Sequence, residues 1–224
     1  MPSWNIHTAH VEHLLAEEGR DALGIRDVDA FLMGNLLPDI YVGYMVPNPT
    51  TRIDYKLTHL TLRHHIPVPR HQEFWDFYCV NPEGYGAPEV TDVVKGAWCH
   101  LVCDSVYNTH TRARLEQLGV PAGEKARIGK QADFADFGRT LSISLKPQVT
   151  KAVLDQCEAF PMYKVAEPDV RAAAEVAARI VDENTENHIE GMPNYRLLSA
   201  DFFETARQEA HRTMVEGLHK LLAA

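Results

Sequence analysis

The stretch of residues 89–107 constrains the fold more than any other part of this chain. At about 3.6 residues per turn, its apolar side chains cover well over half of the circumference of a helix. The apolar positions are Val93, Val94, Ala97, Trp98, Leu101, Val102 and Val106. A helix that is apolar on most sides needs other helices around it, so this one predicts the centre of a helical bundle.

Helical periodicity also dominates the rest of the chain. It predicts further helices at residues 7–18, 27–36, 70–80, 123–137, 147–160, 168–183 and 200–222. Residues 39–56 and 81–88 contain the prolines and glycines that are typical of loops. The remaining breaks are too short to be linkers between domains. We therefore expect an all-α protein, a single-domain helical bundle over residues 1–224.

Composition narrows the possible functions. The net charge of -9 disfavours an extended nucleic-acid surface, which needs clustered lysine and arginine. The first residues lack the basic and apolar regions of a signal peptide, and no apolar run approaches the roughly 20 residues of a membrane-spanning helix. The four cysteines fit a reducing compartment. We expect a cytoplasmic protein, and the sequence leaves its oligomeric state open.

Histidine is the unusual residue of this chain, because nine of the twelve histidines fall between His7 and His110. Imidazole is the commonest protein ligand of metal ions. On the central helix, His100 and Asp104 are four residues apart, so they share a face and can bind one ion. His110 falls within about a third of a turn of that face. In isolation, a buried hydrogen-bonded pair is the more frequent explanation for two such residues.

Two further segments favour a metal site. His7 lies in the middle of the apolar face of the first predicted helix. The segment Gly34–Asp39 places an aspartate immediately after Pro38, where we expect the second helix to end. Each feature has an ordinary explanation, a satisfied core histidine in one case and a helix-terminating turn in the other. Their combination with the central helix is more specific than any of them alone.

Together these residues resemble the zinc-dependent phospholipases C and the related single-strand-specific nucleases. The spacing of His100, Asp104 and His110 is similar to that family's H-x3-D-x5-H helix, and Gly34–Asp39 is similar to its G-x-x-x-P-D turn. His7 corresponds to the histidine ligand on its first helix. The likeness is closest to a short bacterial branch that begins with Met-Pro-Ser, and it covers about half of the chain. It implies a helical bundle with up to three zinc ions in a cleft.

The resemblance also implies a role for each residue. Asp104 would bridge two ions, with His7 on one ion and with Asp39 and His100 on the other. His110 would begin a third site. Three residues are candidates for the family's remaining histidine ligand: His59, His64 and His65. We favour His59 because of its distance from the P-D turn.

The chain departs from the family's pattern in two respects. The secreted enzymes bind zinc through a processed N-terminal tryptophan, whereas Trp4 is internal here. The family also carries an H-x-x-x-E or H-x-x-x-D pair after its third histidine, and none follows His110. Asp133 and Asp136 are candidate replacements, although an exposed helix face is the simpler explanation. A site with one or two ions is therefore an alternative, and divalent transition metals other than zinc accept the same ligands.

The expected activity is hydrolysis of a phosphate ester. Coordination lowers the pKa of a bound water from about 16 to about 7, so that it can attack phosphorus. Asp39 and Asp104 are the expected catalytic residues, and Asp39 would orient the water or accept its proton. The substrate is either a small phosphorylated molecule or a phospholipid. Candidate contacts to the phosphate are Arg63, Arg70 and Lys130.

Two other functions compete with this one. A metal phosphohydrolase of the HD class needs an adjacent His-Asp pair, and the chain offers only His64-His65 and Cys103-Asp104. A non-enzymatic protein with a remnant structural metal site would explain the missing late ligand pair. In that protein all coordination positions would be filled by side chains, whereas catalysis needs a position open to water.

Overall fold

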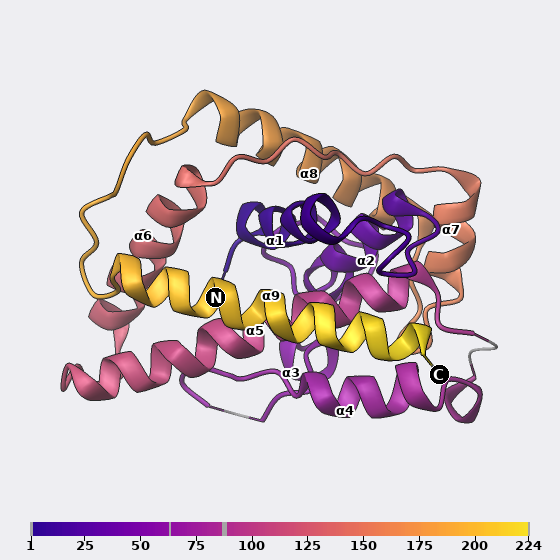
Figure 1. Ribbon diagram of the computed structural model, residues 1–224, viewed down its shortest axis with the longest axis horizontal. Coiled ribbons are helices and arrows are strands. Elements are labelled where there is room, and N and C mark those ends of the chain that lie inside the picture. The colour runs from indigo at the N-terminus through magenta and orange to yellow at the C-terminus, as the bar shows by residue number, and fades with distance from the viewer. Residues whose placement is uncertain (1, 63, 87–88, 224) are drawn as a thin grey trace.

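Helices make up the regular structure of the part of the chain that a computed structural model describes, residues 2–62, 64–86 and 89–223. In chain order (Figure 1) they are α1 (Trp4–Glu18), α2 (Val28–Ile40), α3 (Tyr55–Thr58), α4 (His71–Trp75), a π-helical turn (Asp76–Val80), a 3-10 turn (Glu83–Tyr85), α5 (Asp92–Gln117), α6 (Glu124–Thr140), α7 (Lys151–Glu158), α8 (Glu167–Glu186) and α9 (Ala200–Leu222). The described ranges contain no strand, so the predicted all-α fold is confirmed. Within the same ranges, no helix combines the length and the apolar character that crossing a membrane requires.

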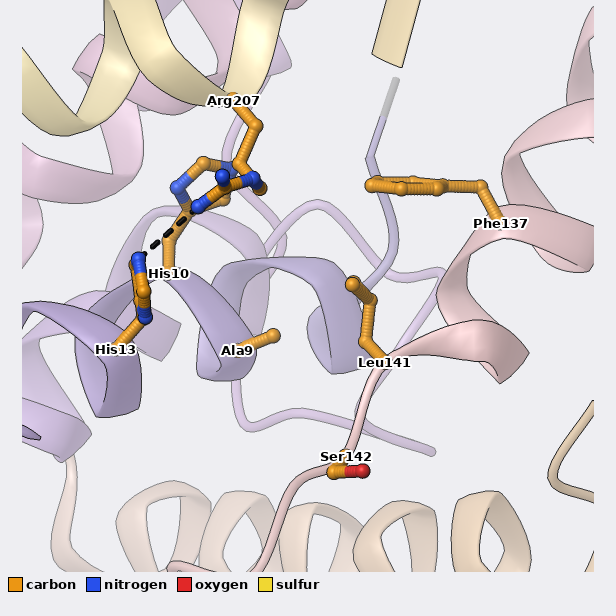
Figure 2. Close-up of a pocket in the computed structure, with 7 residues that line it drawn as sticks. All are labelled: Ala9, His10, His13, Phe137, Leu141, Ser142 and Arg207. Atoms are coloured by element: carbon orange, nitrogen blue, oxygen red, sulfur yellow. Dashed lines mark hydrogen bonds between the residues drawn. The ribbon is translucent and has the colours of Figure 1, made fainter. Parts of the chain in front are cut away.

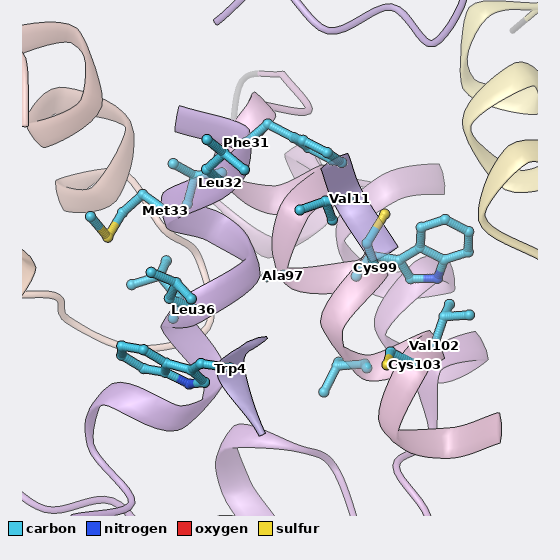
Figure 3. Packing of buried hydrophobic residues seen from close by; sticks show 14 of the residues in the cluster. Trp4, Val11, Phe31, Leu32, Met33, Leu36, Ala97, Cys99, Val102 and Cys103 are labelled. Atoms are coloured by element: carbon cyan, nitrogen blue, oxygen red, sulfur yellow. The ribbon is translucent and has the colours of Figure 1, made fainter. Parts of the chain in front are cut away.

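The long helix α5 lies in the core, as its apolar circumference predicts. Thr91 caps its start, where the side-chain oxygen accepts a hydrogen bond from the backbone N–H of Val94. Its buried side chains form one continuous core with those of α1 and α2 (Figure 3). The helix extends to Gln117 rather than to residue 107, because Thr111 and Leu115 continue its buried face.

The helices α2 and α5 approach each other so closely that only glycine fits at their crossing. A Cβ atom at Gly34 would lie 2.1 Å from the carbonyl oxygen of Val93, and one at Gly96 would lie 2.1 Å from the carbonyl oxygen of Phe31. Any side chain at these positions would force the helices apart. This crossing therefore determines which residues of the two helices meet farther along.

The other long helices surround α2 and α5. In Figure 1, α1 and α2 lie between α8 on one side and the pair formed by α5 and α9 on the other. Helix α9 begins where Ser199 accepts a hydrogen bond from the backbone N–H of Phe202, which matches the predicted range. The N-terminal half of α1 is thereby enclosed, so the side chains that it directs inward are buried.

Helix α2 does not end at Pro38, and this prediction was wrong. The proline occupies the last turn, and the helix continues to Ile40. Proline crowds the carbonyl group four residues earlier, which here belongs to Gly34. Asp39 consequently projects from the last turn of a helix and not from a loop. Similarly, α1 begins at Trp4 and not at residue 7.

Candidate metal centre

Five of the six predicted metal ligands converge in the interior. Helix α1 supplies His7, the last turn of α2 supplies Asp39, the residue after α3 is His59, and α5 supplies His100 and Asp104. We call these five residues the inner cluster. Two groups of three, His7–Asp39–His100 and His59–His100–Asp104, each bring one ligand atom per residue within 4.8 Å of the others.

Distances inside the inner cluster fit ligand atoms that share an ion. His7 Nε2 lies 3.4 Å from Asp104 Oδ1, and His59 Nε2 lies 3.6 Å from Asp104 Oδ2. His59 Nε2 is also 3.6 Å from Asp39 Oδ1 and 3.2 Å from His100 Nε2. Two ligands bonded to one tetrahedral zinc ion at about 2.05 Å are roughly 3.3 Å apart. Because the two oxygens of Asp104 face different imidazoles, this carboxylate is placed as a bridge would be.

Hydrogen bonds outside the cluster fix the orientation of two of the rings. His100 Nδ1 lies 2.8 Å from the backbone carbonyl of Asn35, so Nδ1 carries the proton. His59 Nδ1 lies 2.7 Å from the hydroxyl of Thr58. The Nε2 atom of His100 is then unprotonated, and it lies 3.2 Å from Nε2 of His59. With His59 protonated at Nδ1, a cation between the two Nε2 atoms would bind both rings.

The remaining atoms of the inner cluster include buried groups that make no hydrogen bond. Both ring nitrogens of His7 and Oδ1 of Asp104 have no hydrogen-bond partner. The two side chains are 0% and 1% exposed, so water does not reach them freely. Leaving such groups unsatisfied costs about 1–3 kcal/mol each, and more for a charged group. These residues therefore fit a metal ion, which would satisfy two of the three atoms, His7 Nε2 and Asp104 Oδ1.

Burial determines the charge of the inner cluster. It lowers the pKa of His7 to about 4, with help from the neighbouring His100, and it lowers the pKa of His59 well below the usual range. It raises the pKa of Asp39 to about 6. Burial opposes ionisation of Asp104, but the surrounding imidazoles, His7 first, hold the pKa of this carboxyl well below its usual range. Neutral imidazoles beside two carboxylates favour a divalent cation.

Two aromatic residues that no sequence motif assigned to the site donate hydrogen bonds to its carboxylates. The Tyr55 hydroxyl donates a hydrogen bond of 2.8 Å to Asp104 Oδ2, and its ring stacks on His59 with centroids 3.7 Å apart. Trp4 Nε1 donates to Asp39 Oδ2 at 3.1 Å. Tyr55 precedes His59 by four residues, but the expectation of a loop over residues 39–56 concealed the helical turn that they share. Trp4 was considered only as a metal ligand.

His110 does not join the other predicted ligands. Its Nε2 lies 2.8 Å from Glu209 Oε2 on α9, and it belongs to neither ligand group of the inner cluster. It follows Asp104 by six residues, which is about 9 Å along a helix axis. Of the three candidates for the loop histidine, the structure brings only His59 to the cluster, whereas His64 and His65 are exposed.

The two aspartates considered as replacement ligands have other partners. Asp133 is 0% exposed, so the expectation of an exposed helix face was wrong for this residue. Its carboxylate accepts hydrogen bonds from three successive backbone N–H groups, those of Arg196, Leu197 and Leu198. Asp136 pairs with Arg139 and Arg196. Both carboxylates therefore anchor the segment before α9 to α6.

The basic residues expected near the phosphate occupy different positions. Arg63 lies outside the described residues. Arg70 donates to the carbonyl of Leu60 and pairs with Glu73. Lys130 is 6% exposed on α6; burial lowers its pKa, while the charge of Asp104 raises it. This ammonium group therefore lies within the electrostatic field of the inner cluster.

Access to the inner cluster is narrow. Asp39 is its most exposed member, with 13% of the side chain accessible. Two surface cavities of the described chain, of about 320 Å³ and about 690 Å³, lie elsewhere, and no residue of the cluster lines either of them. Among the ligand side chains of the inner cluster, Asp39 is therefore the most accessible to a small molecule.

Comparison of the chain with protein-family models, with curated proteins and with solved structures finds no match. The resemblance to the zinc-dependent phospholipases C consequently depends on the motif residues alone, and it stays a prediction. The structure adds that the side chains of five residues, which lie between positions 7 and 104 of the sequence, are close together in the interior.

Proposed function

We propose that this chain is a metal-dependent hydrolase of phosphate esters, similar to the zinc-dependent phospholipases C. The observation that supports it most is the inner cluster, where three imidazoles and two carboxylates meet and where His7 and Asp104 hold buried atoms that no hydrogen bond satisfies. Mixed nitrogen and oxygen ligands favour zinc, and other divalent transition metals bind the same set.

The hydrogen bond of His100 limits how this residue takes part in a site with two ions. Because its Nδ1 is occupied by the carbonyl of Asn35, His100 offers a single nitrogen and can bind only one ion. We assign His59, His100 and Asp39 to one ion and His7 to the other. Asp104 would bridge them through its two oxygens.

The residues of the site would divide the chemistry between them. Ions bound here would polarise the phosphoryl oxygens and acidify water. Asp39 is the ligand with the most solvent exposure, so it is suited to orient the attacking water and to accept its proton. Tyr55 holds the carboxylate of Asp104 in place from outside the ligand set. Lys130 is the candidate for contact with the phosphate.

The substrate class is the phosphate ester itself. The net charge of -9 disfavours long polyanions, and the burial of the ligands, of which Asp39 is the most exposed at 13%, favours a small or flexible substrate. A small phosphorylated molecule and the headgroup of a phospholipid share this chemistry. The proposal includes both, and the assay below separates them.

Hydrolysis assays on zinc-loaded protein test the proposal. Bis(p-nitrophenyl) phosphate, p-nitrophenyl phosphate and phosphatidylcholine vesicles would be compared, with Asp104→Asn beside wild type. Asp201→Asn, an exposed position on α9, is the matched control. We expect turnover of at least one substrate by wild type and by the control, and none above background by Asp104→Asn. Equal rates in all three proteins would contradict the proposed site.

A structural metal site is the second candidate function, and the burial of the ligands favours it. Three of the imidazoles are 0% exposed, which suits an ion closed off from solvent. A structural site is supported if the protein binds zinc, gains thermal stability from it and hydrolyses none of the three substrates. The alternative of the HD class gains no support, because the inner cluster contains no adjacent His-Asp pair.

A further inference from the structure

A second group of metal-ligating side chains lies on the outside of α1. His13 and Glu17 are one turn apart on this helix, and His211 faces them from α9. Glu17 Oε2 lies 3.1 Å from His13 Nε2 and 3.1 Å from His211 Nε2. We call these three residues the outer cluster. None of them belongs to the inner cluster, and none was assigned a role from the sequence.

The hydrogen bond from Arg207 shows which nitrogen of His13 carries a lone pair. Arg207 Nη1 lies 3.0 Å from His13 Nε2, as the dashed line in Figure 2 marks. A guanidinium group only donates hydrogen bonds, so this nitrogen accepts and carries a lone pair. The lone pair and the Glu17 carboxylate are both electron-rich, and they lie 3.1 Å apart. Arg207 supplies the positive charge beside them.

A metal ion can supply this positive charge in place of Arg207 without breaking the other contacts of Arg207. Its Nε and Nη2 atoms hold Glu204 at 3.1 Å and 2.9 Å, so only the Nη1 contact to His13 would be lost. The separations of 3.1 Å within the outer cluster are close to the roughly 3.3 Å between two ligands of a tetrahedral zinc ion.

We propose that the outer cluster is a second binding site for zinc or a similar divalent transition metal, separate from the inner cluster. Two histidines and one glutamate are a set of three protein ligands that leaves a fourth position open. The side chains of His13, Glu17 and His211 are 38%, 49% and 17% exposed, so the ion would enter directly from solvent. Because its ligands come from both helices, the site would fasten α9 to α1.

The outer cluster lies beside a cavity. His13 and Arg207 also line the cavity of about 320 Å³, together with Ala9, Phe137 and Leu141 (Figure 2). His13 lies six residues after His7, which is about 9 Å along α1, so the two clusters share no ligand. The proposal therefore does not depend on the function proposed for the inner cluster.

Zinc titration of the full-length chain tests this inference. Protein stripped with a chelator would be titrated with zinc against a chromophoric competitor, and the number of equivalents bound would be counted. We expect His211→Gln to bind one equivalent fewer than wild type, or to bind it more than about 100-fold more weakly. His219→Gln, which changes an exposed histidine on the same helix, should match wild type.

Two further variants keep the test decisive. Glu17→Gln alters a half-exposed ligand on α1, so it should fold and should lose the same equivalent even if His211→Gln is unstable. Arg207→Gln removes the competing positive charge and should bind that equivalent more tightly than wild type. Equal stoichiometry and equal affinity in wild type, Glu17→Gln and His211→Gln would overturn the proposal.

Discussion

The inner and outer clusters are built from the same residue types in different surroundings. Both combine histidines with carboxylates from separate helices, at separations between 3.1 Å and 3.9 Å. In the outer cluster, a nearby guanidinium and solvent balance the carboxylate. Three buried atoms of the inner cluster, on His7 and Asp104, have no hydrogen-bond partner, against one in the outer cluster, Nδ1 of His211.

This difference shows that burial, and not residue type, decides how strongly a metal ion is required. His13 and Glu17 are partly exposed and can pair with each other, with Arg207 or with water, so an ion at the outer cluster adds a contact to groups that are largely satisfied. Water cannot compensate the inner cluster in this way, because its imidazoles are 0% exposed. We therefore expect the metal-free chain to be destabilised mainly by the inner cluster.

The largest effect is expected from Asp104→Asn, which removes the bridging carboxylate from the inner cluster. Loss of the proposed bridge should lower phosphate-ester hydrolysis by about 1000-fold or more, equivalent to roughly 4 kcal/mol of transition-state stabilisation. His110→Gln should change the rate by less than about tenfold, because His110 pairs with Glu209 away from the cluster. Comparable losses of activity in the two variants would indicate that His110 is a metal ligand after all. The assay is initial-rate hydrolysis at saturating zinc.

The second largest effect concerns the helix crossing that aligns the inner cluster. Gly96→Ala would place a methyl group 2.1 Å from the carbonyl oxygen of Phe31, so we expect a loss of about 3 kcal/mol in unfolding free energy. Chemical denaturation measures this loss. At Gly123 a Cβ atom meets nothing within 4 Å, so Gly123→Ala is the matched control. If the two variants were equally stable, close packing of α2 on α5 would not be what aligns the residues of the inner cluster.

A smaller effect is expected from Tyr55→Phe, which keeps the ring on His59 and removes the hydrogen bond to Asp104. Loss of a partner that orients a ligand typically weakens metal binding by about 10–100-fold. Zinc competition with a chromophoric chelator measures this change. Tyr44→Phe, at a side chain that is 84% exposed, should have no effect. An unchanged affinity in Tyr55→Phe would mean that Asp104 is held by the ions alone.

The smallest effect concerns His10, which lies between the two clusters on α1 and shares a hydrogen bond with Tyr107. Burial lowers the pKa of His10 to about 3, so between pH 6.5 and pH 3 the unfolded chain binds a proton that the folded chain does not. The stability contributed by neutral His10 is therefore present above this window and falls as the pH decreases. In metal-free protein, His10→Gln should reduce the pH slope of the unfolding free energy by about 1.4 kcal/mol per pH unit. The same slope in the variant and in wild type, from denaturation at pH 5 and pH 6, would contradict this.

The sequence predicted the parts of the fold that depend on local patterns. The apolar circumference of residues 89–107 indicated a central helix, and the spacing of His100 and Asp104 indicated a shared face. The C-terminal end of α2 was predicted less well, because Pro38 lies in the last turn of the helix and does not end it.

Candidate ligands were predictable from the sequence where a motif existed and not elsewhere. His7, Asp39 and His59 meet the central helix as the resemblance implied, although their role as ligands stays a prediction. His110 has the correct spacing along α5, but the position of Glu209 on α9 gives it another partner. Asp133 looked exposed because its partners, three backbone N–H groups, come from a segment about 60 residues away. Such partners depend on tertiary contacts between distant parts of the chain.

The most direct test of the inner cluster is the zinc content per chain, determined by elemental analysis after gel filtration. The comparison is best made in a His211→Gln background, with and without Asp104→Ala, so that the outer cluster does not contribute. We expect about two equivalents of zinc with Asp104 present and a loss of most of them in Asp104→Ala. No bound zinc in either protein, even after zinc is added back, would contradict the account and leave the inner cluster as a buried network of histidine and aspartate.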